Sequence, residues 1–214
     1  MIIVVGGIKG GAGKSTIAVN LAVARAGRHK VLLVDSDHQQ TTTKWLRQRD
    51  LDYPDRSPNL DYLRTAGSAT RDEIRQAAPQ HEDIIIDVGG MNSITQRAAL
   101  SVADRLIIPV QPRSADLWAL EEICTVIADV LTINPKLKSG AFINRAFSRG
   151  GDNDEAMKLI DGTIGIDLIP LKIVDRKAFS NSFGEGLTVP EIQPVDRKAV
   201  EELQALYLQL FHTS

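Results

Sequence analysis

Short apolar runs that alternate with longer helical segments constrain the fold of this 214-residue chain more than any other feature. Most of the runs, such as IIVVG at residues 2–6 and DIIIDV at 83–88, are apolar at successive positions. Strands of this kind are covered on both faces, as in a parallel sheet. The expected strands are residues 2–6, 30–35, 83–88, 105–110, 140–144 and 166–171, with a weaker candidate at 60–65.

Helical segments separate these runs, which predicts an α/β fold: a doubly wound, mostly parallel sheet with helices on both faces. In such sheets, ligands bind beyond the carboxyl ends of the strands. No internal repeat, low-complexity tract or long linker divides the chain, so we expect residues 1–214 to form one domain. The expected helices are residues 14–27, 41–49, 70–79, 93–102, 115–132 and 153–161, with an amphipathic helix at 197–214.

Composition restricts the possible classes of function. The formal net charge is −2, so contact with nucleic acid requires a local basic patch. The single cysteine, Cys124, excludes an internal disulfide and fits a reducing compartment. The N-terminus does not resemble a signal peptide, no apolar run is long enough for a membrane span, and Glu201 and Glu202 lie on the polar side of the last helix. We therefore expect a cytoplasmic protein without membrane contact.

A glycine-rich loop, IKGGAGKST at residues 8–16, follows the first strand and leads directly into a helix. That order is the context of a phosphate-binding loop, in which glycines and the helix N-terminus direct backbone N–H groups at phosphate oxygens. Lys14 would reach the β- and γ-phosphates, Ser15 would hold Mg²⁺ and Thr16 would contact the α-phosphate. The alternative is a glycine-rich turn with an exposed lysine. The expected ATP or ADP site comprises Lys9, Gly10, Gly11, Ala12, Gly13, Lys14, Ser15 and Thr16.

The segment from Lys9 to Thr16, K-G-G-x-G-K-S-T, resembles the deviant Walker A motif of the ParA/MinD family of P-loop ATPases. A strict phosphate-loop pattern would require glycine where this chain has Ile8. The resemblance implies that Lys9 is the signature lysine, which reaches the phosphates of the other subunit in an ATP-bound sandwich homodimer. Such a cation could neutralise charge on the transferred phosphoryl group, so hydrolysis would depend on dimerisation. A solvated surface lysine is the alternative.

Acidic residues end two of the expected strands. Asp35 and Asp37 in DSDHQ resemble the family's D-x-D-P-Q motif, although His38 replaces the usual proline. The resemblance implies that Asp37 positions or activates the attacking water and that Asp35 helps to hold the Mg²⁺ shell; both could instead be turn residues. Asp87 occupies the Walker B position, where it would accept hydrogen bonds from Mg²⁺-bound water. Gly90, three residues on, suits a loop that senses the γ-phosphate.

Within the family, residues 103–122 and 41–49 resemble small plasmid-partition ParA proteins. The chain also begins at the phosphate loop, without a helix-turn-helix extension, and one cysteine cannot support a metal-cluster carrier. The resemblance implies a bacterial, nucleoid-associated ATPase that partitions a plasmid, binds DNA non-specifically as an ATP-bound dimer, and is stimulated by a small centromere-binding adaptor of the ParB or ParG kind. A positioning ATPase for a protein cargo and a P-loop enzyme acting on a small molecule are the alternatives.

Two further sets of residues are candidates for binding. Asn144, at the end of an expected strand, would read the adenine edge by resemblance, or would cap a turn. The tripeptide Asp-Arg-Lys occurs twice near the C-terminus, each time where an aspartate could cap a helix. Cations in the first turn of a helix oppose its dipole, which indicates a role other than stability, although a solvated face is the alternative. The expected DNA-binding residues are Lys172, Arg176, Lys177, Arg197 and Lys198.

Overall fold

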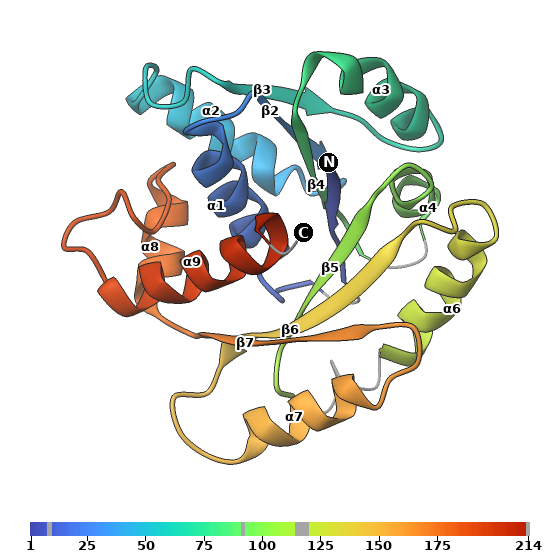
Figure 1. The fold of residues 1–214 in the computed structure, drawn as a ribbon. Helices are drawn as coiled ribbons and strands as arrows, with labels where there is room; N and C mark the ends of the chain where they lie inside the picture. Colours follow the sequence, from blue (N-terminus) through green and yellow to red (C-terminus); the bar gives the residue numbers. More distant parts are fainter. Residues whose placement is uncertain (8–9, 91–92, 114–119, 213–214) are drawn as a thin grey trace.

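The computed structural model describes residues 1–7, 10–90, 93–113 and 120–212. Within these ranges seven strands form one sheet in the order β3-β2-β4-β1-β5-β6-β7, and every neighbouring pair is parallel (Figure 1). All the expected strands are confirmed, including the weak candidate near residue 60. The strands are β1 (Ile2–Val5), β2 (Val31–Ser36), β3 (Leu60–Arg64), β4 (Asp83–Val88), β5 (Arg105–Val110), β6 (Lys138–Ala146) and β7 (Asp167–Val174).

Helices cover both faces of the sheet, which confirms the doubly wound α/β fold (Figure 1). One face carries α1 (Lys14–Ala26), α2 (Thr41–Asp52), α8 (Lys177–Gly184) and α9 (Arg197–Phe211). The other carries α3 (Ala69–Ala77), with its short 3-10 extension η1 (Ala78–Gln80), α4 (Ile94–Leu100), α6 (Leu120–Leu131) and α7 (Asp152–Asp161). The expected helix at 115–132 is confirmed from residue 120 onward, and its first residues lie outside the described ranges.

Two hydrophobic cores explain why the strands are apolar at successive positions. In β1, Val4 packs into the core beneath α3, α4, α6 and α7, whereas Ile3 and Val5 pack into the core beneath α1, α2 and α9. In β4, Ile86 packs into the same core as Val4, and Ile85 packs into the same core as Ile3 and Val5. Because successive strand residues point to opposite faces, a sheet buried on both sides requires apolar residues at every position.

The two Asp-Arg-Lys tripeptides behave differently. Asp196 caps α9, since its side chain accepts a hydrogen bond from the Ala199 N–H at 3.1 Å, as expected. The corresponding expectation for Asp175 is wrong: the N-cap of α8 is Arg176, with no side-chain cap hydrogen bond, and Asp175 instead faces Arg145 at 3.3 Å. No helix in the described part of the chain is long and apolar enough to cross a membrane.

Candidate nucleotide-binding site

The glycine-rich loop connects β1 to α1 at the carboxyl edge of the sheet, and α1 begins at Lys14. Gly11 and Gly13 have φ values of +85° and +86°, a region that side chains disfavour. Gly13 is also constrained by its surroundings, because a Cβ there would lie 2.5 Å from Nδ2 of Asn144. The N–H groups in the first turn of an α-helix have no carbonyl partner within the helix, which suits the start of α1 to an anion. Ile8 and Lys9, and with Lys9 the predicted contact across a dimer, lie outside the described residues.

The side chain of Asn144 is buried beneath this loop, with 4% of its surface exposed. Its Nδ2 donates a hydrogen bond to the carbonyl oxygen of Ala12 at 2.7 Å. The amide therefore holds the backbone of a loop that is distant in sequence. Contact with an adenine edge stays a prediction.

Asp35 and Asp87 occupy neighbouring positions in the sheet, because the two residues pair in the register of β2 and β4. Both side chains are completely buried. Asp35 Oδ2 accepts hydrogen bonds from the backbone N–H and the hydroxyl of Thr43, at 2.7 and 2.6 Å. Asp87 Oδ2 accepts one from the Thr42 hydroxyl at 2.7 Å. The start of α2 therefore holds both carboxylates in place at the edge where the phosphates are expected.

Burial raises the pKa of Asp87 to about 7, and the neighbouring charge of Asp35 adds to this rise. Hydrogen bonding from Ser15 and Thr42 and the positive charge of Lys14 oppose it. Asp87 Oδ1 is buried and has no hydrogen-bond partner of good geometry among the described residues. A carboxylate in this state is stabilised by an added cation or by a donor such as metal-bound water.

Oxygen ligands at this edge fit Mg²⁺, which usually takes one or two protein ligands and fills its shell with water and phosphate oxygens. Within the described ranges, no group of three His, Cys, Asp or Glu side chains lies close enough to hold a metal ion. Mg²⁺ at this edge would therefore need phosphate oxygens and water in its shell besides Ser15, Asp35 and Asp87.

Asp37 lies in the loop between β2 and α2, with 14% of its side chain exposed. Its Oδ1 accepts a hydrogen bond from the Gln39 N–H at 2.9 Å and lies 3.1 Å from Nδ1 of His38. The carboxylate also lies against Gly89, the first residue after β4, where a Cβ would stand 2.9 Å from Oδ1. Asp37 is therefore held between its own loop and the loop that follows Asp87.

A cavity of about 320 Å³ adjoins the glycine-rich loop on the side of β6 and α8. Gly13, Thr16 and Asn144 line it on the loop side, and Asp175, Arg176 and Lys177 line it on the other. The segment after β7 therefore borders this cavity. It follows that Arg176 and Lys177, predicted to bind DNA, lie beside the expected nucleotide.

The remaining predicted DNA-binding residues, Lys172 in β7 and Arg197 and Lys198 at the start of α9, are exposed, as is Lys177. Arg176 is half-buried and donates a hydrogen bond to Glu202 at 2.8 Å, so its guanidinium is already engaged within the chain.

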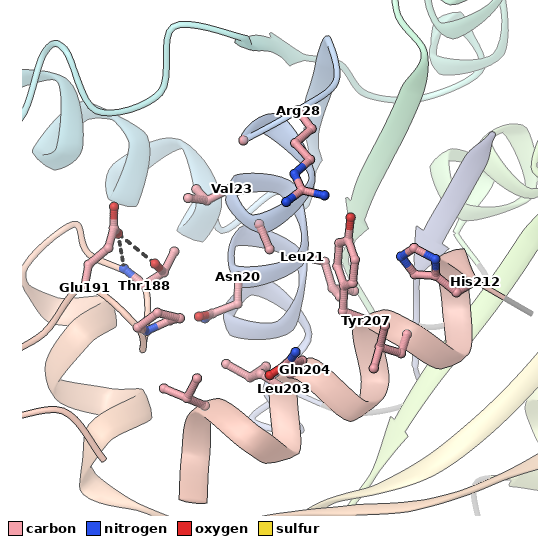
Figure 2. Close-up of a pocket in the computed structure, with 15 residues that line it drawn as sticks. Asn20, Leu21, Val23, Arg28, Thr188, Glu191, Leu203, Gln204, Tyr207 and His212 are labelled. Atoms are coloured by element: carbon pink, nitrogen blue, oxygen red, sulfur yellow. Dashed lines mark hydrogen bonds between the residues drawn. The ribbon is translucent and has the colours of Figure 1, made fainter. Parts of the chain in front are cut away.

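A larger cavity of about 580 Å³ lies between α1, α9 and the segment around Thr188 (Figure 2). Its walls are mixed: Leu21 and Leu203 are apolar, and Gln204 is polar. Figure 2 shows the hydrogen bonds from Thr188 to Glu191, at 2.8 and 2.7 Å, at one end of this cavity. None of the residues predicted from the phosphate motifs lines it.

Several residues of this site were not predicted from the sequence. Thr42 and Thr43 belong to a run of three threonines at the start of an expected helix, and their position just after Asp37 was the available signal. Gly89 and Arg145 carried no such signal, since their contacts join segments far apart in the chain.

The parallel sheet, with a glycine-rich loop between its central strand and a helix, defines a P-loop NTPase fold. The chain belongs to the family described as the CobQ/CobB/MinD/ParA nucleotide binding domain, which matches residues 3–189. Membership of the ParA/MinD family, expected from the loop, is thereby confirmed.

Three relatives illustrate the range of the family. The chain is 26% identical over 203 residues to "Maintenance of carboxysome distribution protein A" of Halothiobacillus neapolitanus, covering 94% of this chain and 92% of the relative. It is 26% identical over 222 residues to "Protein ParA" of Rhizobium radiobacter, covering 98% and 96%. The structure of an ATP complex of McdA from Cyanothece superposes with a TM-score of 0.80 at 15% identity, covering 98% of this chain and 95% of that one.

Proposed function

We propose that this protein is a Mg²⁺-dependent ATPase of the ParA type that partitions a plasmid or similar DNA. The observation that carries the ATPase part of the proposal is the pairing of Asp35 with Asp87 at the strand edge beside Lys14 and Ser15. The similarity to Protein ParA supports partition. Two buried carboxylates beside a lysine and a hydroxyl suit a triphosphate and its metal ion.

The role proposed for each residue of the nucleotide site follows from its position in the fold. Backbone N–H groups of residues 10–13 and the start of α1 bind phosphate, and Lys14 neutralises the β- and γ-phosphates. Ser15, Asp35 and Asp87 hold Mg²⁺ directly or through water, and Thr16 binds the α-phosphate. Asp37, held against Gly89, positions the attacking water. Bound Mg²⁺ would polarise the phosphates and neutralise developing charge.

Dimerisation and DNA binding complete the proposal. Lys9 of each subunit completes the site of the other in an ATP-bound homodimer, a role that rests on the sequence motif alone. The dimer binds DNA non-specifically through Lys172, Lys177, Arg197 and Lys198, with Arg176 held in place by Glu202. It acts on the bacterial nucleoid, in the cytoplasm, until a centromere-binding adaptor stimulates hydrolysis.

A second candidate, the positioning of a protein cargo, is favoured by the similarity to a protein named for carboxysome distribution. The two functions share the nucleotide site and differ in the adaptor. An adaptor that stimulates ATP turnover only with its own DNA site supports partition. Stimulation by a cargo protein without DNA supports the second candidate, and stimulation by a small metabolite contradicts both.

The central test compares the wild type with Lys9→Ala by light scattering and by ATP turnover. We expect ATP to dimerise the wild type only, with turnover largely lost in the variant. Equal dimerisation and turnover in both proteins would refute the role of Lys9.

DNA retention needs separate variants, because Lys177 lines the cavity beside the loop. Arg197→Glu with Lys198→Glu should abolish ATP-dependent retention of DNA while preserving ATP binding. The matched control, Lys136→Glu with Lys158→Glu, makes the same change in charge at exposed positions elsewhere. Since phosphate contacts depend on salt, the wild type should lose DNA as salt rises. Equal retention by both double variants would remove α9 from the DNA-binding surface.

A further inference from the structure

Arg145 has an unusual backbone conformation at the end of β6. Its φ is +53°, in the left-handed region that residues other than glycine seldom occupy. The pairing of β6 with β7 also shifts register between Asn144 and Ala146. Such irregularities turn a side chain into a new direction and are common beside functional sites.

The side chain that is turned in this way contacts the phosphate loop. Nη1 of Arg145 donates a hydrogen bond to the carbonyl oxygen of Gly11 at 3.1 Å. Nε and Nη2 of the same guanidinium face the two carboxylate oxygens of Asp175, each at 3.3 Å. Asp175 therefore holds the guanidinium, and the guanidinium holds the loop.

Asn144, the residue before Arg145, makes a similar contact with the next residue of the loop. Its Nδ2 donates a hydrogen bond to the carbonyl oxygen of Ala12. Two consecutive residues of β6 thus hold two consecutive carbonyl groups of the loop. In a trans peptide the C=O and the N–H point in opposite directions. With the carbonyls of Gly11 and Ala12 held toward β6, the N–H groups of Ala12 and Gly13 point to the opposite side of the loop.

The two glycines before Ala12 leave this part of the loop with few side-chain contacts. A Cβ at Gly10 or Gly11 would meet nothing within 4 Å, whereas the side chain of Ala12 itself is buried. Glycine also has the largest conformational freedom in the unbound state. The hydrogen bonds from Asn144 and Arg145 therefore add to the burial of Ala12 in fixing the orientation of these peptide groups.

We propose that Arg145, braced by Asp175, is a positioning residue that pre-orients the N–H groups of the loop toward the phosphates of the nucleotide. This inference deepens the proposed function and rests on it. Preorganisation of an anion site lowers the free energy lost on binding, so Arg145 acts on affinity without touching the phosphates.

The test uses Arg145→Gly, which removes the guanidinium and suits a backbone with positive φ, so the fold should be retained. Binding is measured for Mg²⁺-ATP and for inorganic tripolyphosphate, a probe that lacks the base and the sugar. We expect both affinities to fall by on the order of tenfold, the effect of one charge-assisted hydrogen bond. The unfolding temperature without ligand should be nearly unchanged, whereas its rise on adding nucleotide should shrink.

Three further variants separate positioning from general stability. Arg149→Ala, an exposed arginine nearby in the chain, should bind like the wild type. Arg145→Lys should recover part of the loss, because an ammonium group can still donate to Gly11. Asp175→Asn should weaken binding less than Arg145→Gly, and the double variant should be no worse than Arg145→Gly alone.

Unchanged affinity for tripolyphosphate in a folded Arg145→Gly variant overturns the inference. So does a loss confined to ATP, which would place Arg145 at the base and not at the loop. Failure of the proposed function is distinguishable, because in that case the wild type itself would bind neither ligand.

Discussion

The carboxylate of Asp37 lies against the backbone of Gly89, so closely that a Cβ on residue 89 would stand 2.9 Å from Oδ1 and 3.0 Å from Cγ. The two residues belong to the loops that follow β2 and β4, which are neighbouring strands of the sheet. Only glycine at position 89 lets the carboxylate take this place. The contact therefore links the residue proposed to position water to the loop that follows Asp87.

Gly89→Ala is expected to displace the Asp37 carboxylate, because the added methyl group requires a shift at one of the two residues. ATP turnover should fall by about tenfold or more, since misplacement by roughly 1 Å has effects of that size. Nucleotide affinity should change little, because the loop and Lys14 are untouched. Steady-state hydrolysis and equilibrium binding of a nucleotide measure the two quantities separately.

Gly151→Ala, outside the nucleotide site, is the matched control. A Cβ at Gly151 would meet nothing within 4 Å, and neither Gly89 nor Gly151 has a positive φ, so neither substitution introduces backbone strain. Equal turnover in both variants would show that contact with Gly89 does not position Asp37.

Asp87 should make the ligand-free protein less stable as pH rises. Its pKa is about 7 in the folded state and near 3.8 when unperturbed, so between these values the folded protein binds a proton that the unfolded chain lacks. The free energy of unfolding therefore falls as pH rises through this window and changes no further, through this group, above about pH 7.

Asp87→Asn removes this titration, and its side-chain oxygen can still accept the Thr42 hydrogen bond. The stability of the variant relative to the wild type should therefore increase from pH 4 to pH 7.5, as measured by urea unfolding without nucleotide or Mg²⁺. Groups remote from Asp87 titrate alike in both proteins and cancel in the difference. A difference that does not depend on pH would contradict a raised pKa.

Arg49 of α2 forms a buried link to the segment before α9. Only 2% of its surface is exposed, and its guanidinium donates to both oxygens of Glu191, at 2.9 and 2.7 Å, and to the carbonyl of Gly186 at 3.0 Å. Arg49→Leu leaves these acceptors without their donor and should lower the free energy of unfolding by about 3 kcal/mol. Arg56→Ala is the control, because Arg56 is exposed and lies 3.8 Å from Glu191; it should change stability by less than about 0.5 kcal/mol.

The ion pair between Arg49 and Glu191 also predicts that the free energy of unfolding decreases at acid pH. Burial raises the pKa of Glu191, but hydrogen bonds from Arg49 and Thr188 and the charge of Arg49 outweigh burial and lower it. A lowered pKa gives stability that is present above the ordinary value of 4.5 and is lost as pH falls through the folded value. Arg49→Leu should remove this stabilisation, so the difference in unfolding free energy between the variant and the wild type should shrink as pH falls below 4.5. A difference that stays constant throughout this acid range would contradict the link.

The fold was predictable because its signals are local. Successive apolar residues in β1 and β4, the glycines of the loop and the caps of the helices all act within a few positions of the chain. The carboxylates Asp35, Asp37 and Asp87 were predictable for the same reason, since each follows a buried strand.

The supporting contacts were not predictable, because they join segments that are distant in sequence. Asn144 meets Ala12 across 132 positions, and Arg49 meets Glu191 across 142. The Asp175 cap was expected from a local pattern, but the distant Arg145 competes for the same carboxylate. Tertiary contacts of this kind override local preference.

Thr43 provides a last prediction, on the support of Asp35. Thr43→Val keeps the shape and the backbone N–H but removes the hydroxyl that donates to Asp35 Oδ2 at 2.6 Å. Because Asp35 is completely buried, loss of one donor should lower the free energy of unfolding by about 1–3 kcal/mol. Thr43→Ser retains the hydroxyl and should lose less than half as much. Chemical denaturation of the three proteins at pH 7.5 measures both values; if Val and Ser variants prove equally stable, the hydroxyl contributes nothing, and the backbone N–H of Thr43 alone holds the carboxylate.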